Sequence, residues 1–264
     1  MGDSMKKTKN QEFTVPNGKH PIFRHVKKLL RLFFGKTKIT YLDGPIAPGS
    51  LMLCNHSAKK GPMALELCRE NFYVMWGAHP MLGGYKDRYG YLRNVFYIQK
   101  KGYSPWLATP LAAFEAIFSI YFYRGMRVLP TYEDGRFIKT VNNSVACLES
   151  DVSVLVFPEN SNEGYQDVMT EFHPGFTLLA KTYARKNPYK DLSIYPMYFH
   201  NKSNRLIIGK PISYALLCEK KLTKQEIAEY FRLSVNALYY EYILGAPVLE
   251  IPDPNKVLVE KTLF

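Results

Sequence analysis

Four short runs of mostly apolar residues recur along the chain, and segments with helical spacing lie between and after them. The runs occupy residues 50–54 (SLMLC), 72–76 (FYVMW), 152–157 (VSVLVF) and 192–199 (LSIYPMYF). Strands that are apolar on both faces are typical of a parallel sheet covered by helices. The pattern therefore predicts an α/β fold with a mostly parallel central sheet flanked by helices.

Further elements complete this arrangement. Two shorter strands are expected at residues 38–42 and 205–209, and helices at residues 62–67, 106–123, 135–150, 175–186 and 223–243. The last helix has its own start signal, because Thr223 is followed three residues later by Glu226 in the pattern of a capping box.

The length and the apolar content favour one large domain. The chain has 264 residues, of which 47% are hydrophobic, and this is enough for one sizeable core. We expect a basic, disordered tail at residues 1–18, an amphipathic helix at 19–36, the α/β domain at 37–245 and an extension at 246–264. The scattered cysteines predict neither a disulfide framework nor a zinc site. We also expect no secretory signal, because no apolar segment precedes residue 21.

Most of the positive charge lies near the N-terminus. Residues 1–40 hold ten Lys and Arg against Asp3 and Glu12, which gives +8 of the total of +12. A basic segment indicates an anionic partner, such as lipid headgroups, nucleic acid or an acidic carrier protein. We expect no nucleic-acid partner, because the chain lacks RNA-stacking and zinc motifs.

Residues 21–34 have the spacing of an amphipathic helix. The apolar face comprises Ile22, Val26, Leu29, Leu30 and Phe33, and the opposite face comprises Arg24, Lys27, Lys28 and Arg31. Such a helix either lies in a membrane interface or packs on the core. We expect peripheral association with the cytoplasmic face of a membrane. Phe23, Leu30 and Phe33 are expected to insert into the bilayer, and anionic headgroups are expected to bind Lys27, Lys28 and Arg31.

Residues 106–123 form the most apolar segment, which Pro110 and Glu115 interrupt. Because spanning a bilayer takes about 20 apolar residues, we expect a buried or membrane-dipping helix here rather than a full span. This segment also favours a lipid partner over a nucleic acid.

Three predicted strands end in polar residues. These are Asn55, His56 and Ser57, then residues 157–165 (FPENSNEGY), then residues 195–201 (YPMYFHN). Ligands of open α/β sheets bind outside the carboxyl ends of the strands. We therefore expect the three loops to line one pocket.

In their order and spacing these stretches resemble the glycerolipid acyltransferase family, which includes the lysophosphatidic acid acyltransferases. The resemblance covers residues 38–245, and the matching stretches are CNHS (54–57), VLVFPENS (154–161), FHPGFTLLAKTYAR (172–185), SIYPMYF (193–199) and LIIGKPI (206–212). It implies transfer of a fatty acyl group from a thioester to a lipid hydroxyl. It also implies acyl-CoA or acyl-carrier-protein as co-substrate, with no bound cofactor and no metal.

The resemblance implies that His56 is the general base, which takes the proton of the acceptor hydroxyl. In the family pattern H-x-x-x-x-D an aspartate orients this histidine, but the corresponding position here is Gly61. A substitute hydrogen-bond acceptor is therefore expected, with Glu159 favoured over Glu66. A backbone carbonyl and a water molecule are the other candidates.

Two cationic positions of the family pattern also differ. The motif F-P-E-G-T-R corresponds to Phe157–Asn162, so an asparagine stands in place of the phosphate-binding arginine. The arginine of the preceding motif is replaced at Pro130 and Thr131, with Arg124 and Arg127 slightly upstream.

We expect substrate contacts from both strand-end loops and from nearby cations, namely Asn55, Ser57, Lys59, Lys60, Arg127, Pro158, Glu159, Asn160, Ser161 and Asn162. Two interpretations remain open. The protein is either a divergent acyltransferase or a non-catalytic relative that binds lipid.

Overall fold

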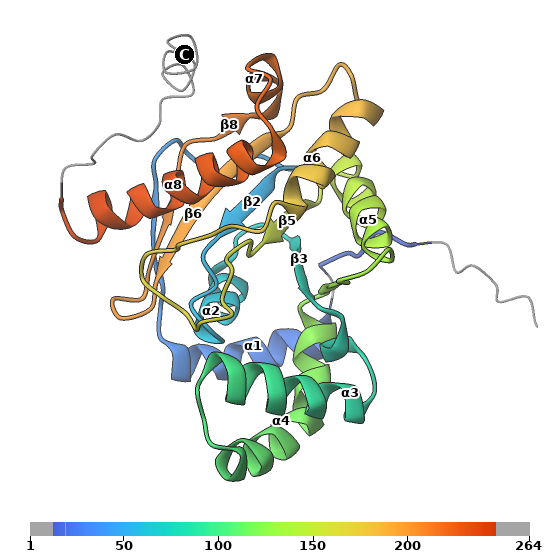
Figure 1. The fold of residues 1–264 in the computed structure, drawn as a ribbon, viewed down its shortest axis with the longest axis vertical. Helices are drawn as coiled ribbons and strands as arrows, with labels where there is room; N and C mark the ends of the chain where they lie inside the picture. The colour runs from blue at the N-terminus through green and yellow to red at the C-terminus, as the bar shows by residue number, and fades with distance from the viewer. Residues whose placement is uncertain (1–12, 19, 247–264) are drawn as a thin grey trace, which may run out of the picture.

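The computed structural model describes residues 13–18 and 20–246, and they form a sheet covered by helices on both faces (Figure 1). The eight strands follow the order β1-β7-β6-β2-β5-β3-β4, and β8 pairs with β6. Pairing is parallel except where β6 meets β7 and β8. The strands are β1 (Lys38–Tyr41), β2 (Leu51–Cys54), β3 (Tyr73–Ala78), β4 (Leu129–Thr131), β5 (Ser153–Val156), β6 (Ser193–His200), β7 (Arg205–Ile208) and β8 (Ile212–Ser213). The predicted α/β class is confirmed.

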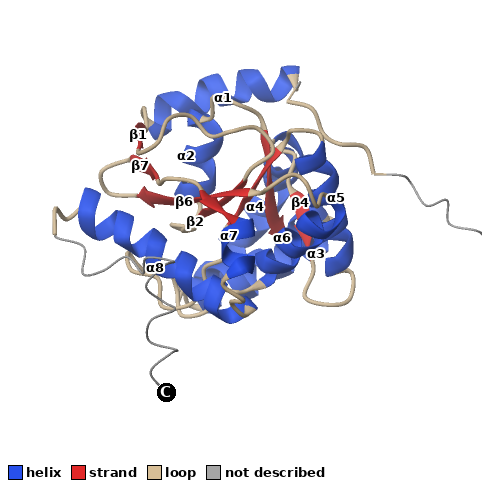
Figure 2. Ribbon diagram, turned by 90° about the horizontal axis from the view of Figure 1, so that it is seen from above, coloured by secondary structure: helices blue, strands red, loops and turns tan. Residues whose placement is uncertain are grey.

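The helices form two layers (Figure 2). One face of the sheet is covered by α5 (Phe137–Glu149), α6 (Gly175–Lys186) and α8 (Lys224–Tyr242), and the other by α1 (Pro21–Phe34) and α2 (Lys60–Cys68). A short helix, α7 (Tyr214–Glu219), follows β8. Every residue of β2 and β5 is buried, which is why both strands have no polar alternation in the sequence.

The predicted capping box of α8 is present. The Thr223 hydroxyl accepts a hydrogen bond from the Glu226 N–H at 3.3 Å, and the Glu226 carboxylate accepts one from the Thr223 N–H at 2.7 Å. The two bonds satisfy N–H groups that have no partner inside the helix.

Residues 79–125 form a helical insertion between β3 and β4. It consists of η1 (His79–Leu82), α3 (Tyr85–Gly90), the π-helical η2 (Tyr91–Lys100) and α4 (Pro105–Gly125). Its small core contains Met81, Leu92, Phe96, Ala112 and Ala116. Only α4 is predicted from the sequence, and it lies on the surface rather than being buried as one reading expected.

The packing of α1 differs from the predicted orientation. Phe23 is buried against α4, where a Cβ on Gly125 would lie 2.3 Å from its ring. Lys27 pairs with the buried Glu66 at 3.1 Å, and Arg31 donates to the Leu67 carbonyl. Phe23, Lys27 and Arg31 therefore hold α1 on α2 and α4. Phe23 is buried and does not face outward as predicted, whereas Arg31 remains exposed.

The terminal segments are only partly described. Phe13 and Val15 pack against the main core, which is not what a disordered tail through residue 18 predicts. The predictions for residues 1–12 and for the extension from residue 247 onward lie outside the described residues.

Candidate functional site

The loop after β2 is tied to the end of β6. The Asn55 side chain accepts from the Phe199 N–H at 2.7 Å and donates to the Phe199 carbonyl at 3.0 Å. The Ser57 hydroxyl donates to the same carbonyl at 3.1 Å and accepts from the Asn55 amide at 3.0 Å. His56 is therefore flanked in sequence by Asn55 and Ser57, the two residues whose side chains anchor the loop.

The register of the sheet brings the second motif loop to the same place. Leu53 pairs with Val156 on one side and with Pro196 on the other, so β2, β5 and β6 run side by side in the same direction. The Glu159 carboxylate accepts a hydrogen bond from the His56 backbone N–H at 2.8 Å. The three strand-end loops therefore meet through hydrogen bonds, but residues 195–201 do not line the cavity that contains His56 and Glu159, so the expectation of one pocket lined by all three loops is only partly met.

The chain takes an unusual course after His56. Ser57 and Ala58 both have positive φ angles, 45° and 53°, a region that residues other than glycine adopt rarely and at a cost. Two such residues in succession turn the chain directly into α2. Backbone of this kind is often found at functional sites.

His56 lines a cavity of about 950 Å³. The imidazole contacts the rings of Phe157 and Tyr165, with centroids 4.9 Å and 5.2 Å away. Pro158, Glu159, Ser161 and Asn162, which belong to the predicted substrate contacts, also line this cavity. The cavity is lined by apolar and by polar or charged side chains in similar measure.

The other predicted contact residues do not line this cavity. Asn55 and Ser57 bond to Phe199, and Asn160 bonds to Glu171 at 2.6 Å. Lys59 pairs with Glu115, and Lys60 donates to the Asn201 carbonyl at 2.8 Å. Arg127 has a φ of 56° and also lies outside the lining. These six residues anchor loops or lie outside the lining of this cavity, and their assignment as substrate contacts stays a prediction.

The structure adds polar lining residues that the motifs did not indicate. They include His79, Lys100, Glu133, Asp134 and Arg136. His173 also lines the cavity, and it lies in the matching stretch at residues 172–185. His79 and Lys100 come from the helical insertion, which has no motif in the sequence. In the sequence, the only indication of where His79 lies was the predicted strand at residues 72–76, which ends shortly before it.

Burial lowers the pKa of His56 from 6.5 to about 4, and the positive charge of Lys100 acts in the same direction. The backbone of Ala58 and of His56 itself opposes this shift only in part. Among the described residues no side chain forms a hydrogen bond with Nδ1 of the ring. The imidazole is therefore held neutral, and a neutral imidazole is the form that accepts a proton.

Neither predicted carboxylate supports the imidazole directly. Glu159 binds the backbone N–H of His56, and burial raises the pKa of its carboxyl group. Glu66 faces the other side of α2, where it pairs with Lys27 and with Arg69 at 2.9 Å. Glu66 is therefore wrong as a substitute for the missing aspartate.

Gly61 has a steric reason to be glycine. A Cβ at this position would lie 2.1 Å from the His56 carbonyl oxygen. Gly61 belongs to α2 and is not among the residues with positive φ. Close approach of two backbone segments, and not a left-handed conformation, excludes a side chain here.

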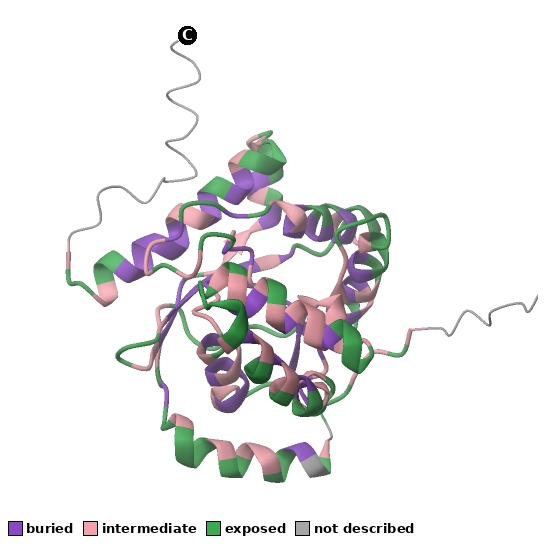
Figure 3. Cartoon of the chain, turned by 60° about the horizontal axis from the view of Figure 1, so that its bottom comes forward, coloured by how far each residue is buried: buried purple, intermediate pink, exposed green. Residues whose placement is uncertain are grey.

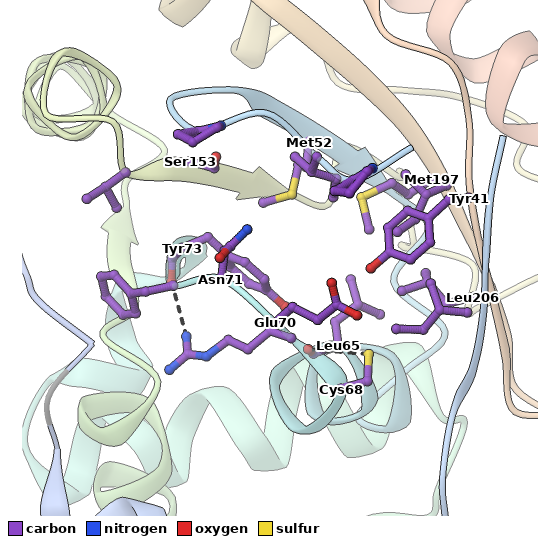
Figure 4. A pocket seen from close by; sticks show the side chains of 18 of the residues that line it. Tyr41, Met52, Leu65, Cys68, Glu70, Asn71, Tyr73, Ser153, Met197 and Leu206 are labelled. Carbon is purple, nitrogen blue, oxygen red and sulfur yellow. Dashed lines mark hydrogen bonds between the residues drawn. The ribbon is translucent and has the colours of Figure 1, made fainter. Parts of the chain in front are cut away.

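A second cavity, of about 310 Å³, lies between α2 and the sheet (Figure 4). Met52, Leu65 and Met197 line its interior, and Tyr41 and Glu70 are among its polar groups. None of the residues predicted for the site line it. Among the described residues, no group of three or more His, Cys, Asp or Glu side chains has the geometry to hold a metal ion.

Comparison with known proteins gives one fold-level likeness. No protein-family profile and no curated protein sequence matches the chain. The chain is similar to the crystal structure of the 1-acyl-sn-glycerophosphate (LPA) acyltransferase PlsC from Thermotoga maritima, with 13% sequence identity and a TM-score of 0.48. The similarity covers 87% of this chain and 82% of that one. A likeness at this level fixes neither a substrate nor an activity for the present chain.

Proposed function

We propose that the protein is an O-acyltransferase that moves a fatty acyl group from a thioester to a hydroxyl of a glycerolipid or related lipid. One observation carries this proposal: a neutral histidine at a strand end lines a large cavity together with Pro158 and Glu159. The motif resemblance supports the same reaction. The co-substrate is acyl-CoA or acyl-carrier-protein.

The proposed step needs only one base. The acceptor oxygen attacks the thioester carbonyl carbon while its proton passes to the His56 imidazole. The tetrahedral intermediate then collapses, the carbon–sulfur bond breaks, and the imidazolium returns its proton to the leaving thiolate. The products are the new ester and the free thiol, with neutral His56 restored.

The arrangement around His56 also predicts slow chemistry. Within the described part of the chain no carboxylate forms a hydrogen bond with the imidazole, and burial disfavours its charged form. Loss of the orienting carboxylate lowers kcat by about 10⁴-fold in a serine protease. We therefore expect a low turnover number. Bound lipid and acyl donor would close the cleft and expel water from it, and this would raise the turnover number.

We further propose that the protein binds a membrane surface through the outer face of α4. Among the described residues, α4 is the one helix long and apolar enough to cross a membrane, and only 22% of its most apolar window is buried. Its exposed side chains include Trp106, Phe114, Ile117, Phe118 and Tyr121. Tryptophan and tyrosine near the ends of an apolar surface are typical of membrane interfaces.

The surroundings of this face favour anionic lipid. Exposed Lys101 precedes α4 and exposed Arg124 ends it. The outer side of α1, which lies at the same end of the molecule, exposes Leu29, Leu32 and Phe33 together with Lys28 (Figures 1 and 3). Each basic residue near an anionic surface contributes about 1 kcal/mol. The cytoplasmic leaflet carries such lipids, so we place the protein there.

Vesicle sedimentation tests the membrane proposal. We expect binding to vesicles that contain phosphatidylglycerol, and a large loss for Phe114→Glu combined with Phe118→Glu. Leu178→Glu, which changes an exposed leucine on α6, is the matched control. Equal binding of both variants would show that α4 is not the contact.

An acceptor screen by mass spectrometry tests the reaction. Purified protein is incubated with acyl-CoA or acyl-carrier-protein and a set of glycerolipids, and new esters are measured. We expect at least one ester that His56→Ala does not form. Lipid binding without any ester formation would favour the non-catalytic alternative.

A further inference from the structure

We propose that Lys59 is a positioning residue that couples the His56 loop to α4, so that contact of α4 with a membrane sets the position of the base. The inference rests on the proposed function, since it adds regulation to the proposed base and to the proposed membrane face.

Lys59 joins the His56 loop to the helical insertion. It stands three residues after His56, directly before the first residue of α2. Its Nζ donates to the Tyr97 hydroxyl at 3.0 Å and pairs with the Glu115 carboxylate. Tyr97 belongs to η2 and Glu115 to α4. One side chain of the loop therefore contacts two helices of the insertion.

The three polar groups form a closed network. The Tyr97 hydroxyl donates to Glu115 at 2.6 Å, so each of the three groups contacts the other two. The Lys59 ammonium also lies over the rings of Phe96 and Tyr97, 4.4 Å and 4.8 Å from their centroids. Burial and the Glu115 carboxylate raise the pKa of Tyr97, which therefore stays protonated as the donor. An isolated surface ion pair contributes little to stability, whereas a network with cation–π contacts holds its members in one geometry.

The backbone beside His56 needs such an anchor. Ser57 and Ala58 both have positive φ angles, and conformations of this kind persist only where the surrounding structure holds them. The first half of the loop is bonded to the end of β6. At the other end α2 begins without a side-chain cap, so Lys59 supplies an anchor that the helix start itself lacks.

The far end of the network is the helix whose outer face is proposed to contact lipid. Exposed Phe114 and Phe118 lie one position before and three positions after Glu115 in α4. The inner side of α4 packs in a core that belongs to the insertion, so the insertion can shift as a unit against the sheet. A change in the position of α4 on a bilayer then passes from Glu115 to Lys59, and from there to the turn that carries His56.

Hydrogen exchange tests the coupling without relying on turnover. Mass spectrometry follows the backbone amides of residues 53–65 in the full chain, with and without vesicles that contain phosphatidylglycerol. We expect vesicles to slow exchange of this segment about 10-fold in wild type, the effect of one charged hydrogen bond. Lys59→Met keeps the length of the side chain without its charge and should lose the response, whereas Lys59→Arg should retain it.

The matched control is Lys86→Met, which removes an exposed lysine of α3 in the same insertion and should respond like wild type. Equal responses of Lys59→Met and Lys86→Met would overturn the inference. Sedimentation with the same vesicles separates the two proposals. A wild type that does not sediment refutes the membrane proposal and this inference with it. A wild type that sediments with unchanged exchange at residues 53–65 refutes this inference alone.

A charge exchange tests the contact itself. Glu115→Lys places two cations together, and Lys59→Glu combined with Glu115→Lys restores opposite charges. With vesicles and an acceptor found by the screen, we expect kcat to fall about 10-fold in Lys59→Met and in Glu115→Lys, with KM retained, and to recover in the double variant. A double variant no more active than Glu115→Lys would refute the coupling. If no ester forms with any acceptor, the proposed reaction fails, and the exchange measurement still decides on Lys59.

Discussion

The Glu159 carboxylate accepts a hydrogen bond at 2.8 Å from the backbone N–H of His56, and not from its imidazole. The acid of the second motif therefore holds the loop that carries the base. In a histidine–aspartate pair the carboxylate instead orients the ring and stabilises its charge. The two arrangements make different predictions for substitution.

Glu159→Gln keeps an oxygen that accepts from the His56 N–H, so we expect nearly normal stability and a small loss of activity. Glu159→Ala leaves a buried N–H without its partner, which costs about 1–3 kcal/mol. Urea denaturation and acyl-transfer assays measure both effects. A carboxylate-specific role would instead appear as a severe activity loss in Glu159→Gln.

His56→Gln removes the base from the cavity. We expect acyl transfer to fall by about 10²- to 10⁴-fold, the usual contribution of a general base, with an unchanged circular dichroism spectrum. The matched control is His79→Gln, which changes another histidine of the same cavity. A His56→Gln protein with normal activity would exclude His56 as the base.

The lowered pKa of His56 has a consequence for the pH profile. Because the ring stays neutral down to about pH 4, the acid limb of kcat/KM is expected near that value. A histidine of ordinary pKa would place the limb near pH 6.5. Stopped assays between pH 4 and 8 locate the limb, and a midpoint above pH 6 would contradict the burial argument.

Stability is expected to follow the same shift. The unfolded chain binds a proton at His56 near pH 6.5, whereas the folded chain does so only near pH 4. This group therefore destabilises the fold as pH falls from 6.5 to 4, by up to about 1.4 kcal/mol per pH unit. The difference in free energy of unfolding between wild type and His56→Gln should change with pH by this slope. If the unfolding free energies of the two proteins changed equally with pH, the lowered pKa of His56 would be disproved.

Gly61→Asp restores the residue that the family pattern contains, but we expect it to inactivate the protein. Its Cβ would lie 2.1 Å from the His56 carbonyl oxygen, and overpacking of this kind costs about 1–3 kcal/mol or more. Gly61→Ala carries the same Cβ without the charge and should lose similar stability. A stable Gly61→Asp protein with higher activity would mark the wild type as an enzyme that has lost its aspartate.

Lys27 is expected to hold α1 on the domain. Lys27→Ala leaves the fully buried Glu66 with Arg69 as its remaining ion-pair partner, so we expect a loss of about 1–3 kcal/mol. Lys28→Ala, at the exposed neighbouring position, should change stability by less than about 0.5 kcal/mol. Denaturant titrations of the two variants provide the comparison, and equal midpoints would show that the ion pair contributes little.

The sequence alone predicted six strands of the sheet and the meeting of the motif loops, whereas β4 and β8 were not predicted. Buried parallel strands must be apolar on both faces, so β2, β5 and β6 could be recognised from local composition. Parallel neighbours end at one edge of a sheet, which brings His56 and Glu159 together. The start of α8 could likewise be predicted from local sequence, because the two residues of its capping box, Thr223 and Glu226, lie within four positions.

The tertiary structure alone decided which side chains face the cavity and which face of α1 is covered. Lys27 meets Glu66 across 39 residues of sequence, and Lys100 meets Ser161 across 61. Helical period shows that a face is apolar but not what it packs against. Phe23 was therefore expected at a membrane, whereas in the structure it is buried. Gly61 is explained only by the backbone of His56 beside it, because steric exclusion depends on the three-dimensional course of both segments.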